Sequence, residues 1–145
     1  MSMTLEIAAK SGYLYVTVMG RFSLEEAKRT FEEILEAVAR SRVGKVLLDG
    51  RGVVGSPELM ERFYYSEFAA KSVAEFAHRG VSRDTQFAYV LEVPMRDPRR
   101  FGEIVAANRA MLIKTFNNIN DARAWLGIAP ASNTDVDDGS VRNEK

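Results

Sequence analysis

The residues best suited to chemistry lie in one stretch, Lys45 to Pro57, which reads KVLLDGRGVVGSP. The apolar run from Val46 to Leu48 is typical of a short strand buried on both faces. We expect Asp49 to end this strand and the glycines that follow to form a flexible loop. Asp49 and Arg51 then form a polar pair at the mouth of the sheet. This pair either binds a ligand or leaves Asp49 satisfying N–H groups of the loop.

Two residue types at the end of this stretch are typical of a helix start. Ser56 is a good N-cap, and Pro57 suits the first helical position, where no N–H is needed. Because free N–H groups and the helix macrodipole stabilise a phosphate at such a position, Ser56 is a candidate phosphoacceptor. The alternative is an N-cap with no further role, which contributes about 1 kcal/mol.

Three arginines surround a second expected helix start, at Asp97 and Pro98. Arg96, Arg99 and Arg100 are expected beside N–H groups that are free at a helix N-terminus, where they form a candidate anion site. Cations at this end of a helix oppose its macrodipole, which hints at a negative group nearby. The alternative is that all three are ordinary solvent-exposed side chains.

The elements that position these groups follow from the spacing of apolar residues. Alternating patterns around Ser11 and Gly12 predict a hairpin, and an apolar stripe after a capping box of Ser23 and Glu26 predicts a helix. Further strands are expected at 46–48, 85–92 and 113–116, and further helices over about 57–78 and after Pro98. A last short helix is expected to begin after Asn118 or Asn120 and to end at Gly127. This order predicts an α/β fold: a mixed, mainly parallel sheet of about five strands with an opening antiparallel hairpin and four helices.

The second predicted helix carries more aromatic surface than docking on a sheet requires. Its expected core-facing band consists of Leu59, Phe63, Ala70, Val73, Ala74 and Ala77. Tyr64 and Phe68 fall to one side of that band, and Tyr65 and Phe76 to the other. Surplus aromatic surface usually marks an interface, a covered pocket or a neighbouring element. We expect an interface, and with it a non-enzymatic regulatory module. It would bind a protein partner and form a homodimer through this helix.

The alternative is a small-ligand protein, in which the same aromatic residues and Met60 line an apolar pocket under the second helix for a lipid-like molecule. An enzyme is the weakest hypothesis. The single histidine, the lack of cysteine and the lack of an ordered Ser/Lys spacing leave nothing to activate a nucleophile. The same absences exclude thiolate and histidine metal clusters, and we expect no cofactor and no metal.

Composition restricts the remaining classes. Twenty basic and twenty acidic residues give a net charge of zero, so no global field attracts nucleic acid. No apolar run reaches the roughly 18 residues of a membrane span, and the N-terminus lacks a secretory signal, so a cytoplasmic setting is the default. Apolar anchors vanish near residue 129. We therefore expect one domain over 1–128 and a disordered acidic tail over 129–145.

Several segments occur in a recognisable order. They are Gly20-Arg21-Phe22 before the capped first helix, the strand VLLDGRG, the aromatic-rich helix after it and the ending TFNNINDARAWL. In this order they resemble the SpoIIAA-like group of the STAS (sulphate transporter and anti-sigma antagonist) superfamily, over about residues 5–128. The resemblance implies a small sheet with helices and a role in protein–protein regulation. In STAS antagonists a serine that begins the helix after the central strand is phosphorylated by a partner kinase, and Ser56 holds the comparable place.

Overall fold

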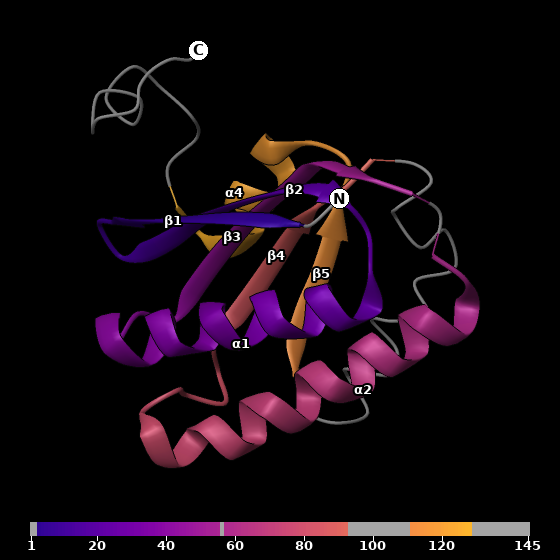
Figure 1. The fold of residues 1–145 in the computed structure, drawn as a ribbon. Coiled ribbons are helices and arrows are strands. Elements are labelled where there is room, and N and C mark those ends of the chain that lie inside the picture. The colour runs from indigo at the N-terminus through magenta and orange to yellow at the C-terminus, as the bar shows by residue number, and fades with distance from the viewer. Residues whose placement is uncertain (1–2, 56, 93–110, 129–145) are drawn as a thin grey trace.

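A computed structural model describes residues 3–55, 57–92 and 111–128. Within them the chain forms a five-stranded sheet with helices on both sides (Figure 1). The strands are β1 (Thr4–Lys10), β2 (Tyr13–Arg21), β3 (Lys45–Val54), β4 (Gln86–Val90) and β5 (Leu112–Phe116). The helices are α1 (Leu24–Ser41), α2 (Leu59–Phe76) and α4 (Ile119–Leu126), and the short 3-10 helix η1 (Ala77–Arg79) follows α2.

The strands lie side by side in the order in which they occur in the chain. β1 is antiparallel to β2, and each later pair of neighbours is parallel. This confirms the predicted mixed, mainly parallel sheet with an opening hairpin. Three α-helices are described where the sequence predicts four, because the helix expected after Pro98 lies outside the described residues. The tail expected over 129–145 lies outside them as well.

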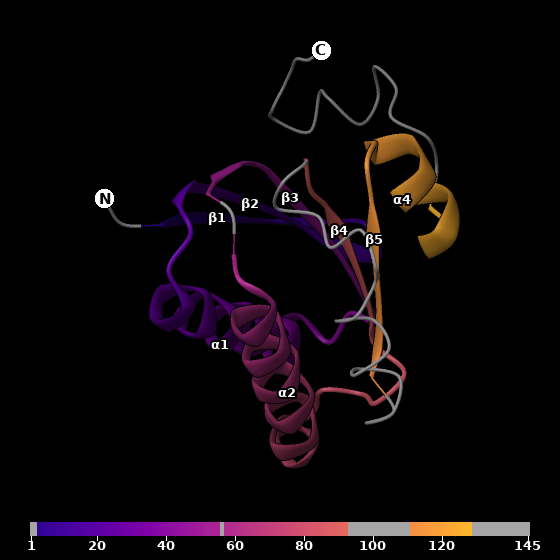
Figure 2. The same ribbon diagram turned by 90° about the vertical axis from the view of Figure 1, so that its right-hand side faces the viewer.

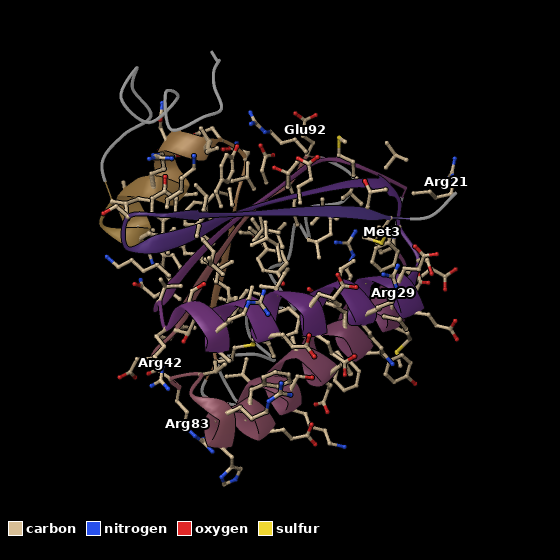
Figure 3. All side chains as sticks on the ribbon, turned by 60° about the vertical axis from the view of Figure 1, so that its left-hand side comes forward. Met3, Arg21, Arg29, Arg42, Arg83 and Glu92 are labelled. Carbon is tan, nitrogen blue, oxygen red and sulfur yellow. The ribbon has the colours of Figure 1, made fainter. Side chains whose placement is uncertain are left out.

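α1 and α2 cover one face of the sheet, and α4 lies on the other (Figures 1 and 2). Right-handed crossovers between parallel strands that advance in one direction place both connecting helices on the same side. Apolar side chains fill the space between the sheet and α1 (Figure 3). A smaller apolar cluster lies beneath α4 and includes Tyr13, Leu47 and Leu126. Across the described residues, none of the helices combines the length and apolar character that a bilayer crossing requires.

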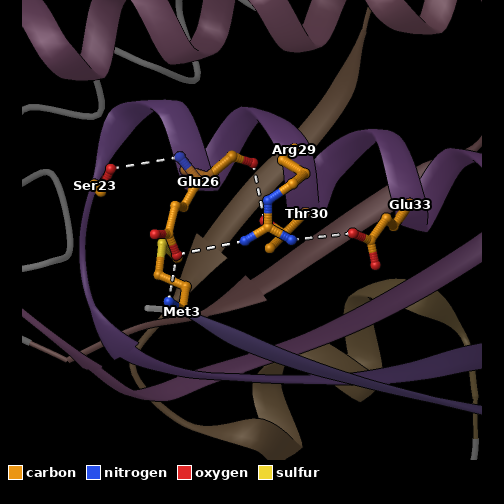
Figure 4. Close-up of polar contacts among 7 residues, drawn as sticks. Met3, Ser23, Glu26, Arg29, Thr30 and Glu33 are labelled. Atoms are coloured by element: carbon orange, nitrogen blue, oxygen red, sulfur yellow. Dashed lines mark hydrogen bonds and ion pairs between the residues drawn. The ribbon is translucent and has the colours of Figure 1, made fainter. Parts of the chain in front are cut away.

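The first turn of α1 is tied to the residue that precedes β1 (Figure 4). Ser23 caps the helix, since its Oγ accepts a hydrogen bond from the Glu26 backbone N–H at 3.4 Å. The Glu26 carboxylate accepts from the backbone N–H of Met3 at 2.6 Å and from the Arg29 guanidinium at 3.4 Å. Glu26 therefore does not complete the predicted capping box, and it anchors the N-terminal strand on α1 instead.

The central strand is longer than the sequence predicts. β3 continues through Asp49, Gly50 and Gly52 to Val54, so the loop expected directly after Asp49 is wrong. Glycine at these two positions lets a neighbouring side chain approach the backbone closely. A Cβ at Gly50 or at Gly52 would lie 2.7 Å from that side chain. The turn falls at Gly55, whose φ of +125° is a conformation that favours glycine.

α2 also begins later than predicted, at Leu59, with Glu58 as its N-cap residue in extended conformation. The Glu58 backbone N–H donates to the Glu61 carboxylate at 2.9 Å. The N-cap role expected of Ser56 is therefore wrong, because the chain stays non-helical beyond Pro57. Ser56 itself lies outside the described residues.

Candidate functional site

A β-bulge helps to join Arg51 to Asp49. The register between β2 and β3 shifts between Thr17 and Met19, where β3 contains one extra residue. Because a bulge leaves a backbone N–H out of the ladder, the Arg51 N–H can donate to Asp49 Oδ1, at 3.2 Å. The Arg51 side chain lies on the same side of β3 as the Asp49 side chain. Its Nε donates to Asp49 Oδ1 at 2.9 Å, and its Nη2 donates to Asp49 Oδ2 at 2.7 Å. This is a bidentate ion pair.

Tyr15 of β2 completes this group, which we name the Asp49 trio: Tyr15, Asp49 and Arg51. The Tyr15 hydroxyl donates to Asp49 Oδ2 at 3.0 Å. Burial alone would raise the pKa of Asp49, but the hydrogen bonds and charge of Arg51 outweigh burial and lower that pKa. Burial, together with the charge of Asp49, raises the pKa of Tyr15 to about 12. At neutral pH the trio therefore consists of a carboxylate, a guanidinium and a neutral phenol.

The Asp49 carboxylate finds its hydrogen-bond donors within the trio. The two carboxylate oxygens accept four hydrogen bonds, three from Arg51 and one from Tyr15. A second polar pair lies on the same face of the sheet, where the buried Arg123 of α4 donates to the Tyr13 hydroxyl at 3.1 Å. The polar pair expected from the sequence exists as a direct contact, and ligand binding by it stays a prediction.

The aromatic residues of α2 lie on the opposite side of the sheet from Asp49. The Tyr65 hydroxyl reaches the core and lies 2.5 Å from the hydroxyl of Tyr89 on β4. The Tyr65 ring packs edge-on against Phe31 of α1 at 6.0 Å, and Phe31 contacts Phe87 at 5.5 Å. Burial raises the pKa of both phenols, so both are neutral at physiological pH. These rings therefore pack between α1, α2 and the sheet.

Phe76 is also covered by this chain, at 8% exposed, with the Arg79 guanidinium 4.4 Å above its ring. Phe68 is half-buried beneath the ammonium of Lys28, which lies 5.4 Å from the ring centroid. Of the predicted surplus aromatic surface, Phe76 is therefore buried by this chain and Tyr65 is partly buried. The reason is a rotation of the helix, which turns its small residues toward the core: Ser66, Ala69, Ala70, Ser72 and Val73.

Tyr64 is the aromatic residue of the predicted set that stays largely exposed, at 49%. Three other exposed apolar residues belong to the same segment of chain, namely Val54 at 52%, Leu59 at 47% and Met60 at 52%. We name these four residues the α2 entry surface. The core position expected for Leu59 is wrong, because the rotation that buries Phe76 and partly buries Tyr65 turns the first residue of α2 outward.

The structure thus separates the predicted site residues into two groups with the sheet between them. Asp49 and Arg51 lie on the α4 side, and the aromatic residues of α2 lie on the α1 side. The predicted phosphoacceptor Ser56 and the predicted anion site lie outside the described residues; the latter consists of Arg96, Arg99 and Arg100. Within the described ranges no cluster of histidine and carboxylate side chains is suited to a metal ion.

Sequence reasoning missed Tyr15 and Tyr89, which it treated only as strand residues. Alternation placed Tyr15 on a face with Tyr13 and Thr17, but the partner across the strands depends on the register, which pairs Thr17 with Asp49. Tyr89 meets Tyr65 only after α2 has docked at its observed rotation. Each contact joins residues distant in sequence, so no local pattern could reveal it.

This architecture occurs in a known structure. The chain is similar to an anti-sigma factor antagonist from Mycobacterium paratuberculosis, with a TM-score of 0.54 and 17% identity, over 87% of this chain and 95% of that one. The chain has the SpoIIAA-like fold. It also aligns with an uncharacterized DUF3478-family protein with a SpoIIAA-like fold from Shewanella loihica PV-4. That alignment has a TM-score of 0.47 and 16% identity, over 86% of this chain and 93% of that one. No protein-family model and no curated protein sequence matches the chain.

Proposed function

We propose that the chain is a regulatory module that acts by binding another protein, and that it forms a homodimer through the α2 entry surface. The observation that carries this proposal is the exposure of four apolar side chains within one segment, Val54 to Tyr64. Apolar side chains gathered on a surface usually mark a site that a partner covers. The likeness of the fold to that of an anti-sigma factor antagonist supports a regulatory role of this kind.

The proposed role is non-enzymatic and set in the cytoplasm. Asp49 is the carboxylate best placed for catalysis by its burial, yet its oxygens already accept four hydrogen bonds from Arg51 and Tyr15. A general base needs a lone pair directed at the proton it takes. The bidentate contact with Arg51 engages both carboxylate oxygens, which favours a structural role for Asp49.

Sedimentation equilibrium over a wide range of micromolar concentrations tests the self-association. We expect a dimer whose dissociation constant rises about tenfold in Met60→Asp, because a charge would then be placed in the centre of an apolar contact. Ile7→Asp is the matched control, since Ile7 is also an exposed apolar residue, at 36%, but lies on β1. A monomer at all concentrations, or an equal loss in both variants, contradicts the proposed dimer.

Phosphorylation of Ser56 is part of the proposed regulation, because Ser56 stands in sequence between Val54 and Leu59. A phosphate adds a charge of about −1.5 to −2, which opposes burial of a neighbouring apolar contact. We expect Ser56→Glu to weaken the dimer and Ser56→Ala to leave it unchanged in the same sedimentation experiment. Equal dimer strength in the two variants would argue against the switch.

A second candidate function is binding of a small apolar ligand under α2. Tyr65 and Tyr89 make one hydrogen bond between two hydroxyls, so one phenol proton has no acceptor among the described residues. A buried donor without an acceptor is unfavourable, and a ligand oxygen would satisfy it. Native mass spectrometry of protein purified from cells tests this function. A mass above that of the chain in wild type, absent from Tyr89→Phe, supports ligand binding. Wild type with the mass of the chain alone contradicts it.

A further inference from the structure

The last turn of α1, η1 and the first residues of β3 and β4 meet at one end of the molecule. The Gln86 backbone N–H donates to the Gly44 carbonyl at 2.9 Å, which joins the loops that lead into β4 and β3. A Cβ at Gly80 would lie 4.0 Å from the carbonyl oxygen of Ala39, so η1 packs against the end of α1. Two stretches that are distant in sequence, 39–45 and 77–86, therefore share this edge.

Four arginines occupy this edge, and all are exposed: Arg40, Arg42, Arg79 and Arg83. We name them the arginine edge. Arg42 and Arg83 hold equivalent places, each three residues before a member of the paired residues Lys45 and Gln86. Figure 3 shows both at the same end of the molecule. Within the described part of the chain, none of the four guanidinium groups lies within ion-pair distance of a carboxylate.

Helix electrostatics explain only part of this arrangement. A cation in the last turn of a helix is stabilised by the macrodipole, which accounts for Arg40 and Arg79. Arg83 lies in the loop before β4, where the macrodipole of α1 or η1 does not account for it. Exposed carboxylates are close in sequence, Glu75 at the end of α2 and Asp84 in the loop before β4, yet neither forms an ion pair with the four arginines.

Arg42 is in an unfavourable backbone conformation. It ends α1 with φ 57° and ψ 38°, the left-handed region in which glycine is strongly preferred. It is the only non-glycine residue with positive φ among the described residues. A long charged side chain therefore stands where glycine would give a more stable helix end. Strain of this kind is commonly found where the side chain has a function.

We infer that the arginine edge binds an acidic segment, rich in Asp and Glu, of a partner protein. Guanidinium groups match carboxylates with two parallel hydrogen bonds, and the four groups are not engaged with carboxylates of the described chain. The net charge of zero favours a short acidic peptide over nucleic acid, because no wider basic field extends the patch. The inference rests on the proposed protein-binding role and names the chemistry of the partner. It does not depend on the α2 entry surface.

Fluorescence anisotropy with a labelled peptide of alternating Asp and Glu tests the inference on the full chain. We expect saturable binding that weakens as salt is added, because exposed ion pairs are screened. Arg42→Gly and Arg83→Ser should each weaken binding about two- to fivefold. Arg29→Ala is the matched control, since Arg29 is an exposed arginine of α1 already paired with Glu26 and Glu33, and it should bind as wild type.

Arg42→Gly separates function from structure, because it should unfold at higher denaturant concentration than wild type while it binds peptide more weakly. A purely structural Arg42 predicts the gain in stability without any loss of binding, and that result overturns the inference. So does the absence of saturable binding in wild type, or tighter binding of an RNA oligonucleotide or anionic vesicles with the same arginine dependence. Met60→Asp distinguishes the two proposals: a monomer that keeps its peptide affinity refutes only the proposed dimer surface.

Discussion

The two faces of the sheet differ in how their side chains are packed and hydrogen-bonded. On the side of α1 and α2, the rings of Phe31, Tyr65 and Phe87 pack against one another beneath the helices. On the opposite side, α4 packs on β3, β4 and β5, and the polar side chains of the Asp49 trio bond to one another. In the first set Phe31 belongs to α1, Tyr65 to α2 and Phe87 to β4, whereas the trio belongs to β2 and β3. We call the side of α1 and α2 the covered face, because two helices cover its apolar rings. On the other side, which we call the polar face, α4 covers a smaller apolar cluster, and Tyr15 of the trio packs against that cluster.

This contrast predicts that removing a ring on the covered face costs far more than removing a hydroxyl on the polar face. Phe31 is 0% exposed and lies between Tyr65 and Phe87, so Phe31→Ala leaves a cavity that neighbouring rings cannot fill. We expect a loss of about 3–5 kcal/mol in unfolding free energy, measured by urea denaturation. Tyr15→Phe is the comparison on the polar face and should cost about 1 kcal/mol. Equal losses would contradict the division between the faces.

The sheet could be predicted from the sequence because its signals are local. The hairpin around Ser11 and Gly12 and the parallel strands that follow depend on alternation and on the order of elements, and both are confirmed. The extent of β3 could not be predicted in this way. Gly50 and Gly52 look like loop residues in the sequence, but close packing against side chains of neighbouring strands requires them within the strand.

The candidate site was harder to predict than the fold. The aromatic content of α2 is visible in the sequence, but the rotation that partly buries Tyr65 and exposes Leu59 depends on how α2 packs against α1 and the sheet. The even spread of apolar residues around α2 gave no dominant stripe to fix that rotation. Contacts such as Tyr15 with Asp49 depend on strand register, which a single sequence does not encode locally.

The glycines of β3 give a second comparison between the faces. A Cβ at Gly50 would lie 2.7 Å from Leu91 Cδ2 and 3.4 Å from the backbone oxygen of Val90, within the buried face. Gly50→Ala should therefore destabilise by about 1–3 kcal/mol through overpacking. The three atoms nearest to a Cβ at Gly52 all belong to the side chain of Met19, which is 51% exposed and can shift toward solvent. Gly52→Ala should cost about 1 kcal/mol or less in the same urea experiment; the reverse order would contradict this assignment of faces.

The hydroxyl pair of Tyr65 and Tyr89 is the polar exception within the covered face. Tyr89→Phe leaves the Tyr65 hydroxyl buried without its partner and should cost about 1–2 kcal/mol. Because removal of both hydroxyls leaves no orphan group, the double variant to Phe should lose less than the sum of the single variants. Chemical denaturation of wild type, the two single variants and the double variant gives the coupling energy between the two hydroxyls. Losses that simply add would contradict a direct hydrogen bond between them.

The same pair makes stability depend on alkaline pH. The pKa of each phenol is raised by burial above the ordinary value of 10.0, so the unfolded chain loses these protons first. The stabilisation is therefore fully present below that value and declines as pH rises above it. The double variant of Tyr65 and Tyr89 to Phe should show a weaker decline than wild type in unfolding free energy measured against pH. A decline of equal slope in both proteins would place the titrating groups elsewhere.

The smallest expected effect belongs to the Asp49 trio and is tested at acidic pH. Asp49→Asn removes the charge that Arg51 binds and should cost about 1 kcal/mol at neutral pH, because the Arg51 side chain is 43% exposed and screened by solvent. The pKa of Asp49 is lowered from 3.8 in the folded chain, so the unfolded chain takes up the proton first. The difference in unfolding free energy between wild type and Asp49→Asn should therefore be constant above the unfolded pKa of 3.8. It should vanish as the pH falls through the lower pKa of the folded chain.

Denaturation of wild type and Asp49→Asn at a series of pH values measures this difference directly. Arg51→Lys sharpens it, because lysine keeps the charge but loses the bidentate geometry. We expect Arg51→Lys to fall between the two proteins at neutral pH. A difference between wild type and Asp49→Asn that persists unchanged in acid would mean that hydrogen bonding, and not charge, holds the trio together. The polar face would then resemble the covered face in depending on contact geometry alone.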